Sequence, residues 1–220
     1  MQKIKLNIKG LKKEFNGKCT LNSIDFSVYE GEFLSILGPS GCGKTTILRI
    51  LMGLLQPDGG IVIKDGKDIT NAIPSSRGMG IVFQNYALFE NMTVLENVEY
   101  ALKIRKENKS ADARIKVRER VMQMIEHMDL KEHINKKPIL LSGGQQQRVA
   151  IARAFANKPE VILADEPTGN LDSKTGQDVV ELLLEMQKIY TQTIVMITHN
   201  EKIAQYADII IKIKDGKIQE

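Results

Sequence analysis

A glycine-rich run near the amino end has the composition of a phosphate-binding loop. The segment Gly38-Pro39-Ser40-Gly41-Cys42-Gly43-Lys44-Thr45-Thr46 fits the pattern G-x-x-x-x-G-K-[ST] and lies between a strand-like and a helix-like apolar stretch. Glycines let backbone N–H groups surround phosphate oxygens, and the following helix N-terminus adds partial positive charge. Lys44 can reach the β- and γ-phosphates, and the Thr45 hydroxyl can ligate Mg²⁺. These features favour a nucleotide site over a glycine turn with an incidental Lys-Thr pair.

Two adjacent carboxylates follow a buried-strand pattern later in the chain. Asp165-Glu166 comes directly after the apolar run Val161-Ile162-Leu163-Ala164. Burying such a pair costs free energy unless charge or metal compensates for it. In phosphate-loop proteins the carboxylate at the end of a strand commonly holds Mg²⁺, and we assign that role to Asp165. Strand alternation directs Glu166 differently, so that it can act as a base on water.

Two other polar side chains also end core-strand patterns. Gln84 follows Gly80-Ile81-Val82-Phe83, and His199 ends the strand that begins at Thr193. Taken alone, each is more often an ordinary loop or surface residue. In open α/β sheets, however, ligands bind at the carboxyl ends of the strands. We therefore predict that His199 contacts the γ-phosphate. Gln84 is predicted to contact Mg²⁺ or the attacking water, provided that its strand lies beside the phosphate loop.

Structural and functional interpretations compete at two further places. Phe15, just before an Asn-Gly turn, could pack beneath a sheet or stack on an adenine ring. Ser142 with Gln145 fits a helix capping box. The paired glycines between them leave the helix N-terminus open to an anion. From the residues alone, a capped helix and a second anion site are equally supported.

Strands and helices must bring these residues together. Apolar alternation over 2–9 and 19–28 predicts a half-exposed antiparallel sheet, with a turn at 57–60 leading to another hairpin. Asp172 is expected to cap the helix that begins near Ser173. The remaining patterns predict buried strands at 32–37, 80–83, 161–164 and 193–197, a further strand at 208–213, and helices over 44–54, within 93–137 and from 142.

The helical stretch carries two features with alternative interpretations. Met122, Met124 and Met128 are expected to pack in the core or against a partner rather than to form a cofactor site. The basic stretch from Lys103 to Arg120 is expected to be a solvated helix face, in preference to a nucleic-acid or anionic-lipid surface.

Composition limits the class of protein. The chain has 220 residues, of which 42% are hydrophobic and 26% charged, and its formal net charge is +4. This suits one large or two small domains with a real core, and the charge alone is too small to indicate nucleic acid. Cys19 and Cys42 suggest no disulfide framework, which favours a reducing cytosol. The first nine residues alternate like a strand, not a signal peptide, and no apolar run approaches the ~18 residues of a membrane span.

The order of these motifs resembles the nucleotide-binding subunit of an ATP-binding cassette (ABC) transporter. The resemblance extends over essentially the whole chain, and LSGGQ together with a phosphate loop is far more specific than either motif alone. The segments that carry it are the phosphate loop, Gln84, Leu141-Ser142-Gly143-Gly144-Gln145, Ile162-Leu163-Ala164-Asp165-Glu166, Leu171-Asp172 and His199.

The resemblance implies an α/β fold. Its phosphate-loop NTPase core has a mainly parallel sheet, to which an N-terminal antiparallel β-subdomain and a helical insertion specific to ABC proteins are added. We expect a single domain over 1–220. Within it, 1–85 and 155–220 would form the core and the β-subdomain, and about 86–154 the helical subdomain with LSGGQ.

The resemblance also implies a mechanism. Two copies would close head to tail around two ATP molecules, each held between the phosphate loop of one copy and Ser142-Gly143-Gly144-Gln145 of the other. This favours the anion-site interpretation of that segment. Phe15 would stack on adenine, although many relatives have Tyr there. Cys42 replaces the commoner Ser and should be tolerated, because backbone N–H groups do most of the phosphate binding.

The remaining roles follow position by position from the same resemblance. Lys44, Thr45 and Thr46 would bind phosphate and Mg²⁺, and Asp165 would coordinate Mg²⁺ through water. Glu166 would be the general base, and His199 would steady the γ-phosphate in the transition state. Gln84 would sense the γ-phosphate and, with the segment after it, couple to a membrane subunit, while Asp172 would act across the dimer interface.

Two segments resemble different subfamilies. Arg77 to Phe89 with Met92-Thr93-Val94 resembles importers of polyamines, oxyanions or phosphonates. Ala164 to Ser173 resembles the lipoprotein-release and macrolide-export group and its cell-division relatives. Because the first segment lies where a membrane subunit would dock, we expect an importer, with the lipoprotein-release, export or cell-division ATPase as the alternative. Many such importers carry a regulatory C-terminal domain, for which we expect no room in this chain.

These inferences predict an ATPase with ATP and Mg²⁺ as cofactors. The expected partners are a second copy of the chain, integral membrane permease subunits and, for an importer, an extracytoplasmic solute-binding protein. Nucleic acid is not expected as a partner. The protein would lie peripherally on the cytoplasmic face of the membrane. The substrate is not encoded in these residues, because specificity in this family resides in the other subunits.

Overall fold

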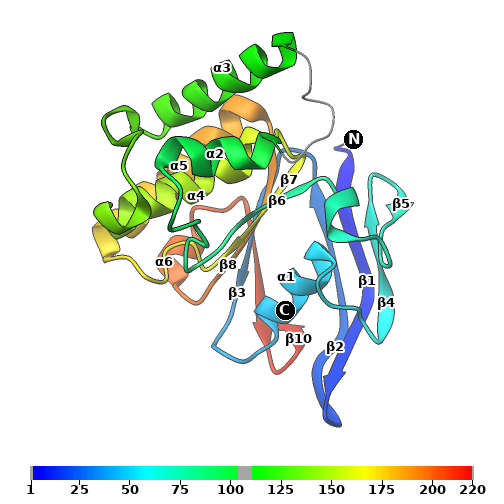
Figure 1. Ribbon diagram of the computed structural model, residues 1–220. Helices are drawn as coiled ribbons and strands as arrows, with labels where there is room; N and C mark the ends of the chain where they lie inside the picture. Colours follow the sequence, from blue (N-terminus) through cyan, green and yellow to red (C-terminus); the bar gives the residue numbers. More distant parts are fainter. Residues whose placement is uncertain (1, 104–110, 220) are drawn as a thin grey trace.

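Two β-sheets and a layer of helices make up the fold (Figure 1). The computed structural model describes residues 2–103 and 111–219, except for the side chains of 111–114. The strand order is β2-β1-β4-β5 in the four-stranded sheet and β10-β9-β3-β8-β7-β6 in the six-stranded sheet. Of the basic stretch predicted over 103–120, residues 104–110 and the side chains of 111–114 lie outside the described residues, while Lys116 and Arg118 are exposed, as expected for a solvated face.

The four-stranded sheet is antiparallel and comes from the amino end, as predicted. It consists of β1 (Ile4–Phe15), β2 (Lys18–Tyr29), β4 (Gly59–Lys64) and β5 (Lys67–Asp68). The first strand is longer than the predicted 2–9. The turn predicted over 57–60 is partly wrong, because Gly59 and Gly60 already belong to β4. Gly60 has φ of +84° and lies against the Gly10 backbone, where a side chain has no room.

The six-stranded sheet carries the phosphate loop. Its strands are β3 (Phe33–Leu37), β6 (Met79–Val82), β7 (Val161–Asp165), β8 (Thr193–Thr198), β9 (Ile209–Lys214) and β10 (Lys217–Gln219). Neighbouring strands are parallel except for β10, which is antiparallel to β9. Every residue of β3 and β8 is buried. Continuous burial explains why these strands appear in the sequence as unbroken apolar runs.

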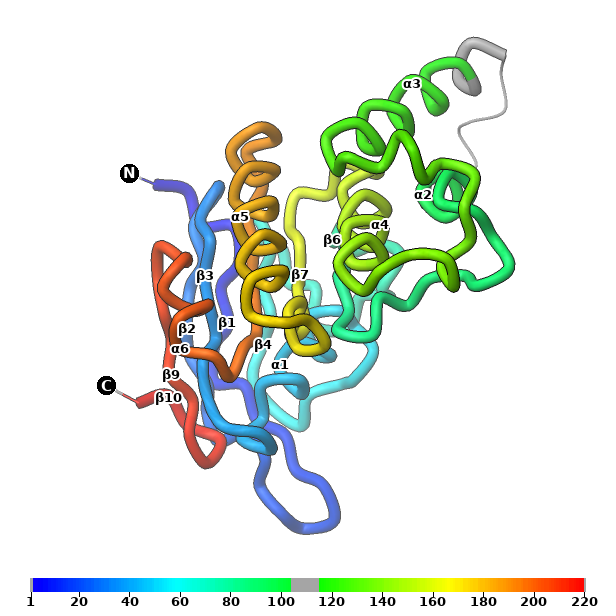
Figure 2. Tube along the Cα trace, turned by 90° about the vertical axis from the view of Figure 1, so that its left-hand side faces the viewer, coloured from blue at the N-terminus to red at the C-terminus, as the bar shows by residue number. Residues whose placement is uncertain are grey.

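Helices cover both faces of this sheet. One hydrophobic cluster joins α1 (Lys44–Met52) to inward-facing residues of both sheets. A second cluster covers the other face with α2 (Val94–Lys103), α3 (Ala111–His127), α4 (Gly143–Ala156) and α5 (Ser173–Tyr190) (Figure 2). Helix α6 (Glu201–Ala204) follows β8. Short 3₁₀ turns occur at η1 (Pro74–Ser76), η2 (Lys131–His133) and η3 (Pro138–Leu140).

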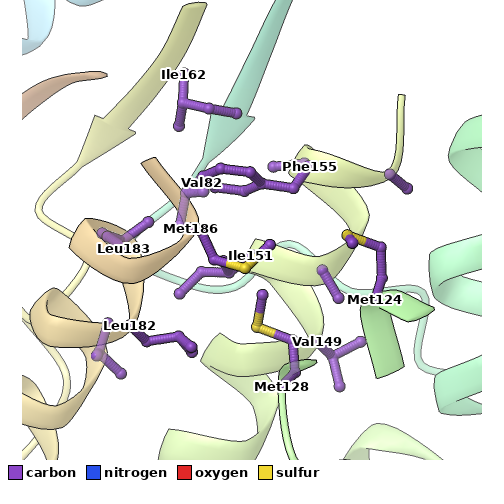
Figure 3. Packing of buried hydrophobic residues seen from close by; sticks show 14 of the residues in the cluster. Val82, Met124, Met128, Val149, Ile151, Phe155, Ile162, Leu182, Leu183 and Met186 are labelled. Carbon is purple, nitrogen blue, oxygen red and sulfur yellow. The ribbon is translucent and has the colours of Figure 1, made fainter. Parts of the chain in front are cut away.

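The methionines of the helical stretch pack in the core, as predicted. Met124 and Met128 are fully buried, and Met122 packs against the same cluster. Figure 3 shows Met128 beside Val149 of α4, with Met124 and Phe155 in the same hydrophobic cluster. This packing joins α3 to α4. None of the described helices combines the length and the apolar composition of a membrane-spanning segment.

Candidate nucleotide site at the carboxyl ends of the parallel strands

The phosphate loop connects β3 to α1 and is shaped by close backbone packing. Gly43 precedes α1 with φ of +105°, a conformation that favours glycine. A Cβ at this position would come within 2.6 Å of Leu21 Cδ2 and 2.9 Å of the Thr20 carbonyl oxygen. No side chain caps α1, so the N–H groups of its first turn remain available to an anion. Strand β2 therefore packs directly against the phosphate loop at Gly43.

The Lys44 side chain folds back onto the loop. Its ammonium donates to the carbonyl oxygens of Gly38 at 2.7 Å and Pro39 at 2.8 Å. The residue is only 4% exposed. These bonds hold the positive charge on the inner side of the loop, where a phosphate group would find a preformed cation.

A cavity of about 550 Å³ brings most of the predicted catalytic residues together. Gln84, Asp165 and Glu166 line it together with the loop, although β6, the strand before Gln84, is separated from β3 by β8 and β7. Thr20 and Arg49 also line the cavity, and the sequence analysis did not identify them. Arg49 could have been suspected as a cation on the first helix after the loop. The complete lining is Thr20, Ser40, Gly41, Gly43, Lys44, Thr45, Thr46, Arg49, Gln84, Asp165 and Glu166.

Asp165 and Thr45 provide the oxygen atoms expected of a magnesium site. The Thr45 hydroxyl lies 3.5 Å from Asp165 Oδ1. Burial raises the pKa of Asp165, and the charge of Glu166 raises it further, against the opposing effects of Thr45, Arg49 and Lys44. A divalent cation would relieve this cost. Mg²⁺ commonly takes one or two protein oxygens together with phosphate oxygens and waters, so these residues fit it.

Glu166 is held in an unusual backbone conformation beside His199. Its φ is +45°, which is uncommon for a residue with a side chain, and its N–H donates to the Ile197 carbonyl oxygen. His199 Nδ1 lies 3.0 Å from Glu166 Oε2. The two residues therefore form a pair at the ends of adjacent strands β7 and β8. The sequence predicted both residues but not their contact.

Gln84 is paired with Asn170, a partner that the sequence analysis did not identify. Gln84 Nε2 donates to Asn170 Oδ1 at 3.4 Å, and Asn170 Nδ2 donates to the Gln84 carbonyl oxygen at 3.1 Å. A Cβ at Gly169 would lie only 2.6 Å from Gln84 Nε2. This glycine thus leaves space for the glutamine side chain.

The segment Ser142–Gln145 forms the predicted capping box at the start of α4. Ser142 Oγ accepts from the Gln145 N–H, and Gln145 Oε1 accepts from the Ser142 N–H. Gly143 leaves no room for a side chain, because a Cβ would lie 2.9 Å from the Tyr86 hydroxyl. None of the described residues that line the phosphate-loop cavity comes from this segment. The segment does not reach the cavity of its own chain.

Asp172 and Phe15, the two other residues predicted to contact nucleotide or the second copy, lie at a helix cap and at a hairpin tip. Asp172 caps α5 as predicted, accepting from the N–H groups of Lys174 and Thr175. The alternative that Phe15 packs beneath the sheet is wrong. Phe15 ends β1 at the tip of the hairpin and is 45% exposed, with the Lys13 ammonium 5.5 Å from its ring centre. Its ring is therefore available for stacking.

Comparison with known proteins decides the family. A family model described as ABC transporter matches residues 21–169, about two thirds of the chain. The chain belongs to the ABC transporter family. The ABC cassette fold is found in the structure of cbiO1 from Clostridium perfringens, described as part of an ABC transporter complex. It aligns over 100% of this chain and 88% of that one, with a TM-score of 0.90 and 31% identity.

The descriptions of three further relatives name a nucleotide or a transported substrate. A dimeric ATP-binding cassette bound to ADP and Pi is 37% identical, with a TM-score of 0.84 over 98% of this chain and 97% of that one. The spermidine/putrescine import ATP-binding protein PotA of Marinobacter nauticus is 42% identical over the full chain, and that of Photobacterium profundum 43% identical over 98%. The chain spans 58% and 57% of the length of these two relatives.

Proposed function

We propose that this ABC cassette binds and hydrolyses ATP and thereby powers import through a separate membrane permease. The observation that supports ATP hydrolysis is that Lys44, Asp165 and Glu166 line one cavity and that His199 contacts the Glu166 carboxylate. Lys44 binds the β- and γ-phosphates, and Thr45 and Asp165 would hold Mg²⁺, which would supply neutralisation of phosphate charge. Similarity to two spermidine/putrescine import proteins supports import and suggests a small polyamine as substrate.

The residues around the phosphate divide the chemical work. Glu166 takes a proton from the attacking water, because its carboxylate lines the cavity at the end of β7. His199 fixes the orientation of that carboxylate through its 3.0 Å contact. The Gln84 amide positions the water, while Phe15, exposed at the end of β1, stacks on the base. The backbone N–H groups between Gly38 and Gly43, with the Ser40 and Thr46 side chains, surround the phosphates.

Two copies complete the site. Ser142–Gln145 of one copy covers the nucleotide held by the other, and Asp172 lies at the same interface. The capped but otherwise open start of α4 supports this role, because its remaining N–H groups and positive helix end attract phosphate. The dimeric ABC cassette at 37% identity supports a pair of copies.

A groove beside Gln84 is a suitable seat for the permease. Met79, Phe83, Phe89, Tyr100 and Arg153 belong to the lining of a cavity of about 610 Å³ between β6, α2 and α4. Arg153 donates to the carbonyl oxygens of Tyr86 and Ala87. These two hydrogen bonds hold the segment that follows Gln84 against α4. A movement of Gln84 at the γ-phosphate would therefore displace the lining of this groove. The ABC cassette associates with the membrane through the permease bound in the groove.

The deciding experiment is affinity purification of the Glu166→Gln variant from native membranes with ATP. Co-purification of a permease with several membrane spans and a solute-binding protein supports import. ATP-driven uptake of radiolabelled spermidine or putrescine by that complex in proteoliposomes then tests the substrate class. A membrane subunit with a large extracytoplasmic domain would instead indicate export, lipoprotein release or cell-wall signalling.

A further inference from the structure

The Gln145 side chain has a second contact outside the capping box. While its Oε1 accepts from the Ser142 N–H at 3.0 Å, its Nε2 lies 2.8 Å from His133 Nε2. The amide is therefore held from both ends. His133 comes from η2, the short turn that follows α3, and lies 12 positions before Gln145.

Hydrogen-bond chemistry assigns the roles of donor and acceptor in this contact. Because Gln145 Oε1 faces an N–H group, the amide presents its NH₂ group to His133, and an NH₂ group only donates. His133 Nε2 must therefore accept this hydrogen bond. Its Nδ1 is buried without a hydrogen-bond partner among the described residues. If Nε2 were a donor, the Gln145 amide would have to rotate so that Oε1 faced His133. The Ser142 N–H would then lose its acceptor.

Backbone hydrogen bonds on both sides of His133 fix the position of its Cα, from which the imidazole projects. The His133 N–H donates to the Leu130 carbonyl oxygen at 2.9 Å, and its carbonyl oxygen accepts from the Lys136 N–H at 2.8 Å. Leu130 itself is fully buried in the helical core. A side chain that projects from such a closed turn can hold Gln145 at one place.

We propose that His133 is a positioning residue for the segment Ser142–Gln145, acting through Gln145. Its ring nitrogen orients the Gln145 amide, which closes the capping box and fixes Ser142 and the start of α4. This inference rests on the proposed role of that segment against the nucleotide of a second copy. Loss of the His133 acceptor should weaken closure of the two copies around ATP. It should leave ATP capture by the phosphate loop unchanged, because neither residue lines that cavity.

The test compares three histidine variants. His133→Leu removes the acceptor, and His133→Gln places an amide oxygen near the former Nε2. His127→Leu is the matched control, because His127 contacts Tyr190 through Nδ1 and not Gln145. ATPase kcat is measured in the otherwise native chain. ATP affinity and the ATP-dependent dimer, followed by size-exclusion chromatography, are measured in the Glu166→Gln background.

We expect His133→Leu to lower kcat about 3- to 10-fold, the effect of losing one orienting hydrogen bond. The dimer should need correspondingly more ATP, while ATP affinity of the single copy stays within about twofold of the parent. His133→Gln and His127→Leu should retain kcat and dimerisation. Native kcat and dimerisation in His133→Leu overturn the inference, and so does a His133→Gln variant that is as impaired as His133→Leu.

Two further variants separate this inference from the proposed function. If Ser142→Ala and Gln145→Ala leave kcat unchanged, the proposed role of the segment fails, and the positioning role fails with it. If they lower kcat but His133→Leu does not, only the positioning role fails. Adding His133→Leu to Gln145→Ala should cause no further loss, because His133 acts through Gln145.

Discussion

Replacing Glu166 by Gln should remove catalysis while keeping the geometry of the site. Gln can still accept from His199 Nδ1, which lies 3.0 Å from Glu166 Oε2. It also keeps the same backbone cost at φ of +45°, because both side chains carry a Cβ. Only basicity and charge change. Loss of a general base lowers kcat by about 10²–10⁴-fold, or about 2.7–5.5 kcal/mol of activation free energy.

The same change should stabilise the nucleotide-free ABC cassette. Burial and the Glu166 charge raise the pKa of Asp165, so the folded chain holds that proton more tightly than the unfolded chain does. Stability linked to Asp165 is complete below the ordinary Asp pKa and is lost as pH rises through the raised value. Removing the Glu166 charge therefore stabilises the folded state at pH 7. A typical gain of about 0.5–2 kcal/mol corresponds to a Tm about 1–8 °C higher.

Phosphate release and thermal unfolding without nucleotide measure these two effects. We expect a large loss of kcat, an unchanged ATP affinity and a higher Tm at pH 7 that returns toward the parental value at low pH. A kcat within about tenfold of the parent would refute the assignment of Glu166 as the base. A lower Tm at pH 7 would refute the argument from charge repulsion.

Three other changes test separate parts of the molecule. Lys44→Ala should weaken ATP binding about tenfold or more by calorimetry, because a charged hydrogen-bond donor to phosphate is lost, and unchanged affinity would contradict the phosphate-loop assignment. Gly169→Ala should lower kcat with little change in Tm, because the new Cβ displaces the flexible Gln84 amide 2.6 Å away. A large drop in Tm would show that the backbone is strained instead. Asp65→Asn should destabilise the chain at pH 7. Burial raises the pKa of Asp65, but hydrogen bonds from Lys5 and other lysines hold it well below its ordinary value. The loss of free energy of unfolding, measured with urea, should therefore become smaller as pH falls below the ordinary pKa of Asp. A loss that does not change with pH would contradict the ion-pair argument.

The sequence by itself determined the features that depend on near neighbours along the chain. The start of α1 at Lys44, the capping box at Ser142 and the cap of α5 at Asp172 each rest on residues within four positions. Their hydrogen bonds involve backbone groups whose places are fixed by helix geometry alone. The buried strands β3, β7 and β8 were also evident, because burial on both faces demands continuous apolar residues. The strand predicted as buried over 80–83 is only partly so, because within β6 Val82 alone is buried.

Tertiary structure decided which of these features meet. The contacts of His199 with Glu166 and of Gln84 with Asn170 join residues 33 and 86 positions apart, and that of His133 with Gln145 joins two elements of the helical layer. The sequence patterns gave the strands but not the order β3-β8-β7-β6 that aligns their carboxyl ends. Whether an aromatic ring at the end of β1 is covered or exposed likewise depends on what lies beside it. Local periodicity reports the side of an element that is buried, whereas the partner on that side is selected by packing of the whole chain.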